Sequence, residues 1–211
     1  MTSNRFPTLG SLMFEIGNAE ARDVDAAVSA LGDAFAEDAL MVYLFHDHAG
    51  GVRAGAMAFF SILLRVRLAL AMPALVLLQG KDVRGAAMGY DATRPAWPDA
   101  FNEEWRAFEA SLPGLAERLG AYEAICDAHQ PRDPHYYLGV IGVHPSLQGQ
   151  GAGKALLEAF CAPSNHDRAS RGVYLDTANA RSLEFYYKNG FELCGEGTLD
   201  GAPLWCVFKP T

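Results

Sequence analysis

Cysteine is scarce in this sequence, and no metal-binding spacing connects the few cysteines that it has. They are Cys126, Cys161, Cys194 and Cys206, and no two of them form a C-x-x-C pair. Common zinc sites place their ligands in closely spaced pairs, so this pattern excludes them. We therefore expect reduced thiols in a cytoplasmic protein, without a disulfide framework and without a bound metal.

Basic residues are in the minority as well. The chain has 17 Lys and Arg against 25 Asp and Glu, which gives a formal net charge of -8. General nucleic-acid binders present a basic face, so this balance argues against a nucleic-acid partner.

Long uninterrupted hydrophobic runs are absent too. The longest apolar stretch, residues 56–78, is broken by Arg65, Arg67 and Pro73. A charge in the middle of a bilayer is costly, so we expect a buried helix followed by a strand, and no membrane association. Residues 1–20 lack a basic start followed by an apolar run, so no signal peptide is predicted.

The remaining composition is typical of a globular protein. The chain has 211 residues, of which 50% are hydrophobic and 20% charged, and this length suits one domain over residues 1–211. Apolar periodicity and turn residues separate helices from strands. The predicted strands are residues 13–16, 74–78, 83–90, 136–143, 172–177, 191–194 and 203–208. The predicted helices are residues 23–37, 51–71, 99–112, 115–125, 155–162 and 180–188.

One stretch, residues 136–154, combines a strand, a glycine-rich turn and the start of a helix. The strand is apolar on both faces, and Pro145 ends it because proline cannot donate to a ladder. Gly149, Gly151 and Gly153 follow at alternate positions. Glycine allows a ligand to approach the backbone closely, and free N–H groups at a helix N-terminus attract anions. A phosphate-bearing ligand is therefore predicted at this turn.

The spacing in this turn distinguishes between known phosphate-binding motifs. Gln148 and Ala155 stand where a Walker A loop needs Gly and Ser or Thr, and the dinucleotide fingerprint has a different glycine spacing. The pattern Gln148-x-x-Gly151-x-Gly153 resembles the pyrophosphate-binding signature of the GNAT superfamily, the acetyl-CoA-dependent N-acetyltransferases.

A second motif follows at residues 179–191. Asn179, Ser182 and Tyr186 lie on one face of the predicted helix. From the residues alone, Asn179 is equally suited to cap that helix and Tyr186 to fill the core. Together with Lys188-x-Gly190-Phe191, the pattern resembles the second GNAT motif.

Within the superfamily, the tail is similar to members of the puromycin N-acetyltransferase type. The matching segments are residues 129–131, 134–138, 174–177 and 201–205.

This resemblance implies an α/β (α+β) fold of the GNAT type. The fold has a mixed central β-sheet of about six or seven strands flanked by helices. A helical insert at residues 91–134 precedes the central strand and lies beside the edge of the sheet. The resemblance also implies acetyl-CoA as cofactor. The implied cofactor-binding residues are Ile141, Gly142, Val143, Gln148, Gly149, Gln150, Gly151, Ala152, Gly153, Lys154, Asn179, Ser182 and Tyr186.

Three residues are candidates for catalysis. The resemblance makes Tyr186 the general acid that protonates the leaving thiolate, and a phenol with a pKa near 10 carries that proton at neutral pH. Asp176 is the first candidate for the general base and His135 the second. A helix cap for Asp176 and a strand-end position for His135 stay open as structural alternatives. Aromatic and histidine side chains that would line the acceptor pocket are Tyr43, Phe45, His46, Trp97 and Trp105.

The expected reaction is direct transfer of an acetyl group from the CoA thioester to a primary amine of a small molecule, without a metal. Two alternatives stay open: a non-catalytic acyl-CoA-binding module, and a peptide or protein N-acetyltransferase. A homodimer also stays open as the assembly.

Overall fold

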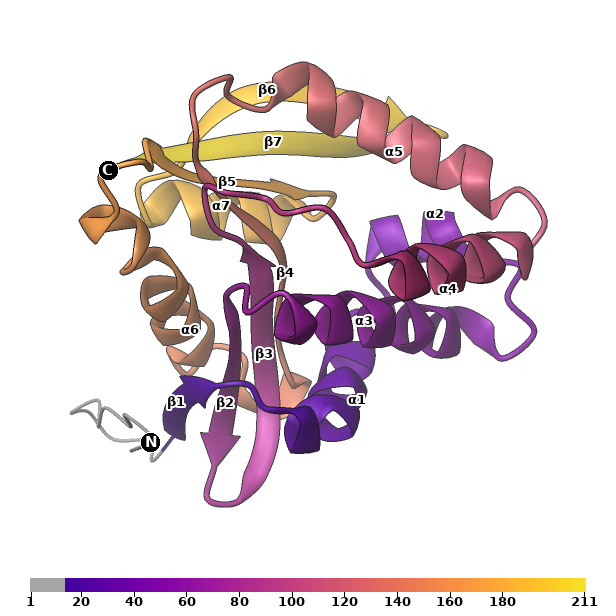
Figure 1. Cartoon of the computed structure of the whole chain (residues 1–211), viewed down its shortest axis with the longest axis horizontal. Coiled ribbons are helices and arrows are strands. Elements are labelled where there is room, and N and C mark those ends of the chain that lie inside the picture. Colours follow the sequence, from indigo (N-terminus) through magenta and orange to yellow (C-terminus); the bar gives the residue numbers. More distant parts are fainter. Residues whose placement is uncertain (1–13) are drawn as a thin grey trace.

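A seven-stranded mixed sheet forms the centre of the structure, a computed structural model that describes residues 14–211 (Figure 1). The strand order is β1-β2-β3-β4-β5-β7-β6. The strands are β1 Phe14–Asn18, β2 Ala74–Gln79, β3 Asp82–Tyr90, β4 Tyr136–Val143, β5 Gly172–Thr177, β6 Glu192–Leu199 and β7 Ala202–Pro210. The helices are α1 Val24–Ala34, α2 Ala39–Phe45, α3 Gly51–Ala69, α4 Asp99–Ala110, α5 Leu115–His129, α6 Ala152–Cys161 and α7 Ala180–Lys188.

The expected α/β fold with a mixed sheet of six or seven strands is confirmed. Met13, the first residue of the first predicted strand, lies outside the described residues. Helix α2 is not among the predicted elements. Asp38 caps it, because its carboxylate accepts hydrogen bonds from the N–H groups of Leu40 and Met41.

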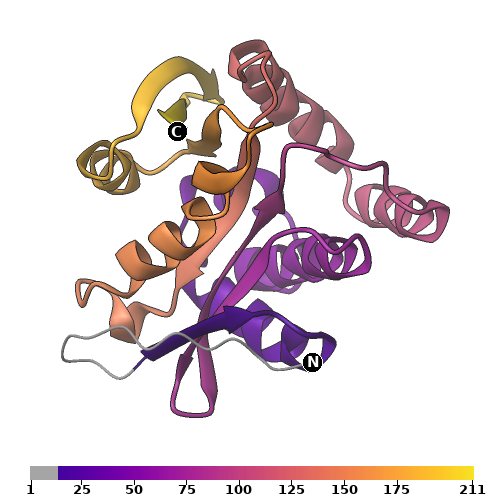
Figure 2. The ribbon, with the colours of Figure 1, turned by 60° about the vertical axis from the view of Figure 1, so that its left-hand side comes forward.

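Helices cover both faces of the first half of the sheet. Helices α1 and α3 pack on one face, and α6 packs on the other against β1 to β4 (Figure 2). Each face has its own apolar core, one around Leu31, Phe60 and Leu64 and the other around Leu156 and Phe160. In residues 14–211, no helix is long and apolar enough to cross a bilayer.

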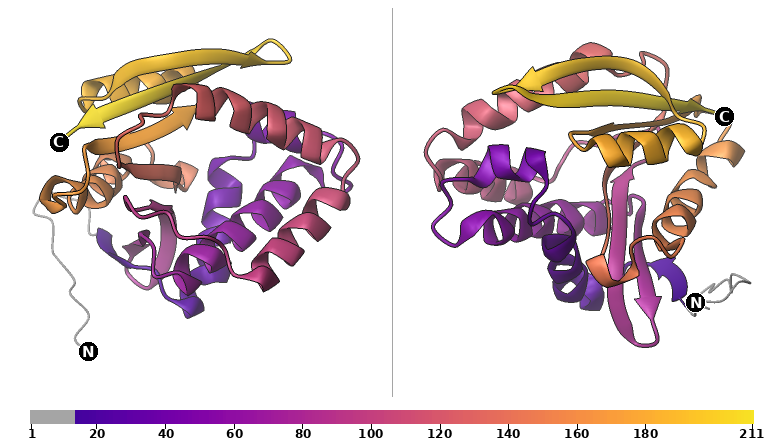
Figure 3. Two further views of the ribbon diagram at one scale, coloured as in Figure 1. Left: turned by 45° about the horizontal axis from the view of Figure 1, so that its top comes forward. Right: turned by 180° about the vertical axis from the view of Figure 1, so that it is seen from behind.

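The predicted helical insert consists of α4 and α5. Helix α4 packs on α3, whereas α5 packs on α2 and on the last two strands, β6 and β7 (Figure 3). Because β6 is the edge strand, the insert lies at the sheet edge as expected. The close approach of α5 to this hairpin is visible at Gly197, where an added Cβ would lie 2.8 Å from Ile125.

The centre of the sheet contains its most consequential irregularity. Strands β4 and β5 are the one parallel pair described, and they are paired only at Tyr136–Val173 and Tyr137–Tyr174. Beyond these residues the two strands diverge, β4 staying with β3 and β5 with β7. A wedge therefore opens in the middle of the sheet, between strands β1–β4 on one side and β5–β7 on the other.

Gly89 supports the strand geometry beside this wedge. It lies at a register shift between β3 and β4, and an added Cβ would lie 1.8 Å from the carbonyl oxygen of Tyr137. Backbone cannot move aside as a flexible side chain can. Only glycine therefore allows β3 to approach β4 at the point where β4 leaves β5.

We expect Gly89→Ala to lower the free energy of unfolding by about 3 kcal/mol, at the upper end of overpacking costs. Gly17→Ala is the matched control, because Gly17 is also a strand glycine and an added Cβ there meets nothing within 4 Å. Urea denaturation of both variants measures the difference. Equal stability of the two variants would show that β3 and β4 tolerate separation at this point.

Candidate active site

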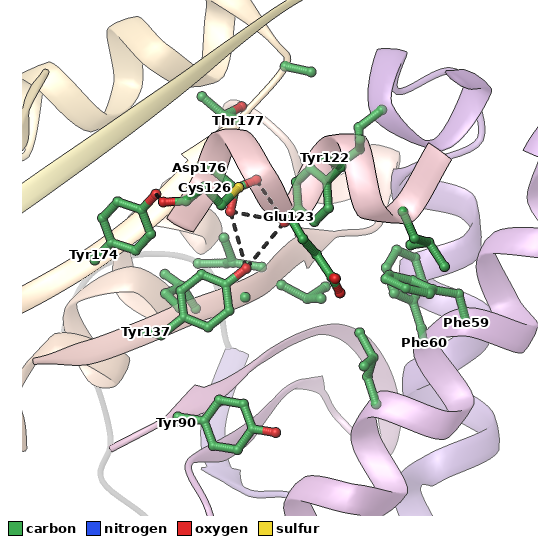
Figure 4. A pocket seen from close by; sticks show the side chains of 18 of the residues that line it. Phe59, Phe60, Tyr90, Tyr122, Glu123, Cys126, Tyr137, Tyr174, Asp176 and Thr177 are labelled. Carbon is green, nitrogen blue, oxygen red and sulfur yellow. Dashed lines mark hydrogen bonds between the residues drawn. The ribbon is translucent and has the colours of Figure 1, made fainter. Parts of the chain in front are cut away.

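The wedge between β4 and β5 leads into a cavity of about 570 Å³. One wall consists of β4 residues Leu138–Ile141, together with Ser182 and Tyr186 from α7. Helices α3 and α5 and the loop before α4 form the other walls. Aromatic side chains line much of the interior, as Figure 4 shows for Phe59, Phe60, Tyr90, Tyr122 and Tyr137.

The glycine-rich turn lies at the N-terminus of α6. Gly149 and Gly151 have positive φ values of 74° and 85°, and a Cβ added at either position would meet nothing within 4 Å. Backbone conformation rather than crowding therefore requires glycine there. No side chain caps α6, and residues 148–151 are exposed. The first N–H groups of this helix are available to an anion, as the sequence predicts.

The side chains of Gln148 and Gln150 form hydrogen bonds to backbone carbonyl groups next to the turn. The Nε2 group of Gln150 donates to the carbonyl oxygen of Ser146 at 2.7 Å, and that of Gln148 donates to Val143 at 3.4 Å. Lys154 forms a surface ion pair with Glu158 at 3.7 Å. The backbone of the turn, rather than these side chains, is left to face a ligand.

The predicted polar face of α7 is divided between two roles. The Asn179 side chain caps the helix, accepting hydrogen bonds from the N–H groups of Arg181 at 2.9 Å and Ser182 at 3.3 Å. Ser182 and Tyr186 line the cavity, whereas Asn179 is not among the lining residues. For Asn179, the structure therefore shows the capping alternative.

Tyr186 is both a core residue and a cavity residue. It is 7% exposed and packs against Phe185 and Phe191, with ring centroids 5.4 and 5.6 Å away. Burial raises the pKa of its phenol above the usual value, with the negative charge of Asp176 adding to the effect. The hydroxyl therefore carries its proton at neutral pH.

Asp176 lies at the C-terminal end of β5 and forms a hydrogen-bonded cluster with two tyrosines (Figure 4). The hydroxyl of Tyr122 donates to both carboxylate oxygens at 3.0 Å, and that of Tyr137 donates to Oδ1 at 3.1 Å. Burial raises the pKa of Asp176 to about 6, although these hydrogen bonds and one from Cys126 oppose the shift. The carboxylate is thus a base of near-neutral strength facing the cavity.

His135 lies elsewhere. Its Nδ1 is 2.7 Å from the carbonyl oxygen of Asp133, and its Nε2 contacts the guanidinium of Arg94. Nδ1 must therefore carry the hydrogen, and the lone pair on Nε2 accepts from Arg94. Burial lowers the pKa of the ring, and His135 is not among the residues that line the cavity. The structure thus places the second base candidate in an arginine-bonded position outside the cavity.

Of the five expected pocket residues, only Trp97 and Trp105 line the cavity. Phe45 is buried in the core against Phe59, and His46 is exposed at the end of α2. Tyr43 packs against the core as well. Sequence reasoning missed other lining residues from α3, β3, β4 and α5, of which Tyr137 alone lies in a segment with a family resemblance. They are Phe59, Phe60, Arg67, Tyr90, Tyr122 and Tyr137.

Within the described residues, the backbone of β4 is paired on one side along its length and is free on the other beyond Tyr137. Gly142 and Val143 pair with Ala86 and Gly85 of β3 on one side. On the β5 side, the described pairing of β4 ends at Tyr137. The strand edge beyond this point therefore faces the wedge, with Ile141 lining the cavity.

Comparison with known proteins identifies the family. Residues 86–191 match the acetyltransferase (GNAT) family, which is half of the chain. The chain belongs to this family. The matched region contains the glycine turn, Asp176 and Tyr186, and the expectation of a GNAT acetyltransferase is confirmed.

A curated sequence relative is the 5-NmdU N-acetyltransferase of Pseudomonas phage PaMx11. It is 34% identical over 96 residues, a match that covers 45% of this chain. The chain spans 66% of that relative's length, slightly less than two thirds. This coverage supports the family but leaves the activity of the whole protein to be proposed.

Solved GNAT structures have the same fold. The histone acetyltransferase HPA2 and related acetyltransferase of Corynebacterium glutamicum superposes with a TM-score of 0.65 and 22% identity, covering 92% of this chain and 94% of that chain. The PaiA N-acetyltransferase of Thermoplasma acidophilum, solved with coenzyme A, has a TM-score of 0.58 and 14% identity. The coverage is 95% of this chain and 100% of that chain. At such identities the similarity concerns the fold alone.

Proposed function

We propose that this protein transfers an acetyl group from acetyl-CoA to the primary amine of a small molecule. The observation that carries the proposal is the wedge between β4 and β5. It runs beside β4, whose C-terminal end leads to the turn at the uncapped N-terminus of α6, and it opens into a cavity that contains a protonated phenol and a carboxylate of near-neutral pKa. A diphosphate, a thioester and an amine would occupy these three places in order.

In this proposal the cofactor is held mainly by backbone. The N–H groups of residues 149–154 bind the diphosphate, and the edge of β4 at residues 141–143 pairs with the pantetheine arm as an additional strand would. Ser182 contacts the arm near the thioester. Asn179 acts indirectly, because its cap holds the first turn of α7 in place.

Asp176 and Tyr186 would move the two protons of the reaction. Acetyl-CoA supplies the activated acetyl group. Asp176 accepts a proton from the acceptor ammonium, so that the amine nitrogen has the lone pair needed to form the new C–N bond. Tyr186 donates its proton to the sulfur as the C–S bond breaks, and the second proton that the nitrogen loses after the C–N bond has formed restores the Tyr186 phenol. Tyr122 and Tyr137 orient the carboxylate of Asp176.

The helical insert supports a small acceptor. Trp97, Trp105 and Tyr122, all from residues 91–134, form walls of the cavity. An aromatic-lined cavity of about 570 Å³ suits a compact molecule. A peptide acceptor would need a groove open at both ends.

Release of free CoA thiol from acetyl-CoA, measured on a panel of small amines and short peptides, tests the function. We expect release with at least one small amine and none with the peptides. Isothermal titration with CoA gives the control. Tight CoA binding without thiol release on any amine would favour the non-catalytic acyl-CoA-binding module.

The cofactor site is tested by Gly151→Val. Valine would extend over the N-terminus of α6, where the diphosphate would lie, so we expect the Kd for CoA to rise at least about tenfold. Gly201→Val is the matched control, because Gly201 also has a positive φ (87°) and an open Cβ position but lies in the β6–β7 turn. Equal CoA affinity of the two variants in isothermal titration would show that the diphosphate does not bind at the N-terminus of α6.

The general acid is tested by Tyr186→Phe. We expect kcat to fall about 100-fold, a typical loss for a general acid, with the Kd for CoA changed less than twofold. Tyr187→Phe, an exposed phenol on the same helix, should retain full turnover. Unchanged kcat in Tyr186→Phe would remove this residue from the acid role.

The general base is tested by the pH dependence of kcat/KM. A base must be unprotonated, so we expect kcat/KM to fall as the pH falls through about 6, the pKa of Asp176. Asp176→Asn should lower kcat/KM about 100-fold at pH 8 and remove this acid limb. Glu123→Gln changes another carboxylate that lines the cavity and should keep the limb. If Glu123→Gln instead removed the fall of kcat/KM at acidic pH, Glu123 rather than Asp176 would be the general base.

A further inference from the structure

Arg67 is a buried cation without a counter-charge. It lies in the last turn of α3, is 4% exposed and lines the acceptor cavity. Its Nε and Nη1 atoms have no hydrogen-bond partner, and within residues 14–211 its guanidinium takes part in no ion pair. Its neighbours are rings: Cζ lies 4.0 Å from the ring centroid of Tyr90 and 5.7 Å from that of Trp97.

Such an arrangement is unfavourable unless something else enters the cavity. Guanidinium groups stay charged in proteins, and a buried charge normally has an anionic partner. Stacking on aromatic rings offsets only part of the desolvation cost. The burial of Arg67 therefore makes sense if an anionic oxygen group of a ligand completes its surroundings.

The nearby arginines do not share this property. Arg94 also lines the cavity, but it donates to Gln130 and to His135. Arg65, two residues before Arg67 on the same helix, forms an ion pair with Glu104 outside the cavity. Arg67 is thus the cavity-lining cation whose partner is missing from the described chain.

Arg67 and Asp176 give the cavity two opposite charges. Both charges act on Tyr137: its hydroxyl donates to Asp176 at 3.1 Å, and burial raises the pKa of this phenol although the positive charge of Arg67 opposes the shift. A ligand with one positive and one negative group would satisfy both charges at once. Trp97 and Trp105 line the space as well and would contact its apolar part.

Building on the proposed function, we propose that the acceptor is an amino carboxylate, whose carboxylate binds the Arg67 guanidinium while its amine approaches Asp176. A single negative charge balances the single unpaired cation. A planar guanidinium can also hold both carboxylate oxygens at once.

Equilibrium binding to the CoA-saturated protein tests this assignment without turnover. The probes are 4-aminobutyrate, 6-aminohexanoate and 4-(aminomethyl)benzoate, each paired with the corresponding amine that lacks the carboxylate. Isothermal titration compares the wild type with Arg67→Met and Arg67→Lys. Arg65→Met is the matched control, because it removes an arginine from the same helix outside the cavity.

We expect at least one carboxylate probe to bind the wild type about tenfold or more tightly than its paired amine, as for a charged hydrogen-bonded contact. Arg67→Met should abolish this preference, Arg67→Lys should retain part of it, and Arg65→Met should keep it in full. CoA affinity and thermal melting of each variant confirm a folded protein. If Arg67→Met does not fold, the reduced preference in Arg67→Lys carries the test.

Two results would overturn the proposal: equal binding within all three pairs by the wild type, or an equal loss of both members of a pair in Arg67→Met. Thiol release, measured in parallel, reports on the proposed acetyl transfer separately. Absence of release with every amine, together with an Arg67-dependent carboxylate preference, would reject the transfer and keep the binding site.

Discussion

The early separation of β4 and β5 is the constraint on which the rest of this structure depends. Two parallel strands that part after Tyr137 and Tyr174 leave backbone hydrogen-bonding groups without a neighbouring strand in the centre of a sheet. Such groups need partners, and a ligand that lies along β4 would supply them. The sheet stays intact on both sides of this opening because β4 is hydrogen-bonded to β3 along its length and β5 to β7. The defect is thereby confined to the functional cleft.

Burial at the end of this cleft sets the chemistry. Asp176 would be an ordinary carboxylate on the surface, but in the cavity its pKa rises to about 6, and Tyr122 and Tyr137 fix its orientation. The same low-polarity surroundings keep Tyr186 protonated. They also make it unfavourable for the Arg67 guanidinium to lack hydrogen-bond partners at Nε and Nη1. One physical cause, removal of water, therefore shapes the proposed base, the proposed acid and the proposed anion site within one cavity.

The helical insert explains how a common fold acquires its own acceptor site. Helix α5 lies across β6 and β7 and brings Tyr122 to Asp176, while the loop before α4 brings Trp97 to the cavity. These walls belong to a segment outside the glycine turn and the α7 motif, the two segments that resemble the family signatures. Family membership therefore indicates the cofactor and the type of reaction, whereas the acceptor depends on residues 91–134 and on α3.

What the sequence by itself determined is local. The turn at Gly149 and Gly151, the strand before it and the start of α7 after Asn179 depend on backbone preferences of neighbouring residues, and all could be predicted. The contact between Tyr122 and Asp176, 54 positions apart, and the unpaired state of Arg67 could not be predicted, because contacts between distant segments arise only when the chain folds. The same packing joined His135 to Arg94 rather than to the cavity. Sequence thus defined the turn proposed to bind the cofactor, and tertiary structure decided the proposed acceptor site.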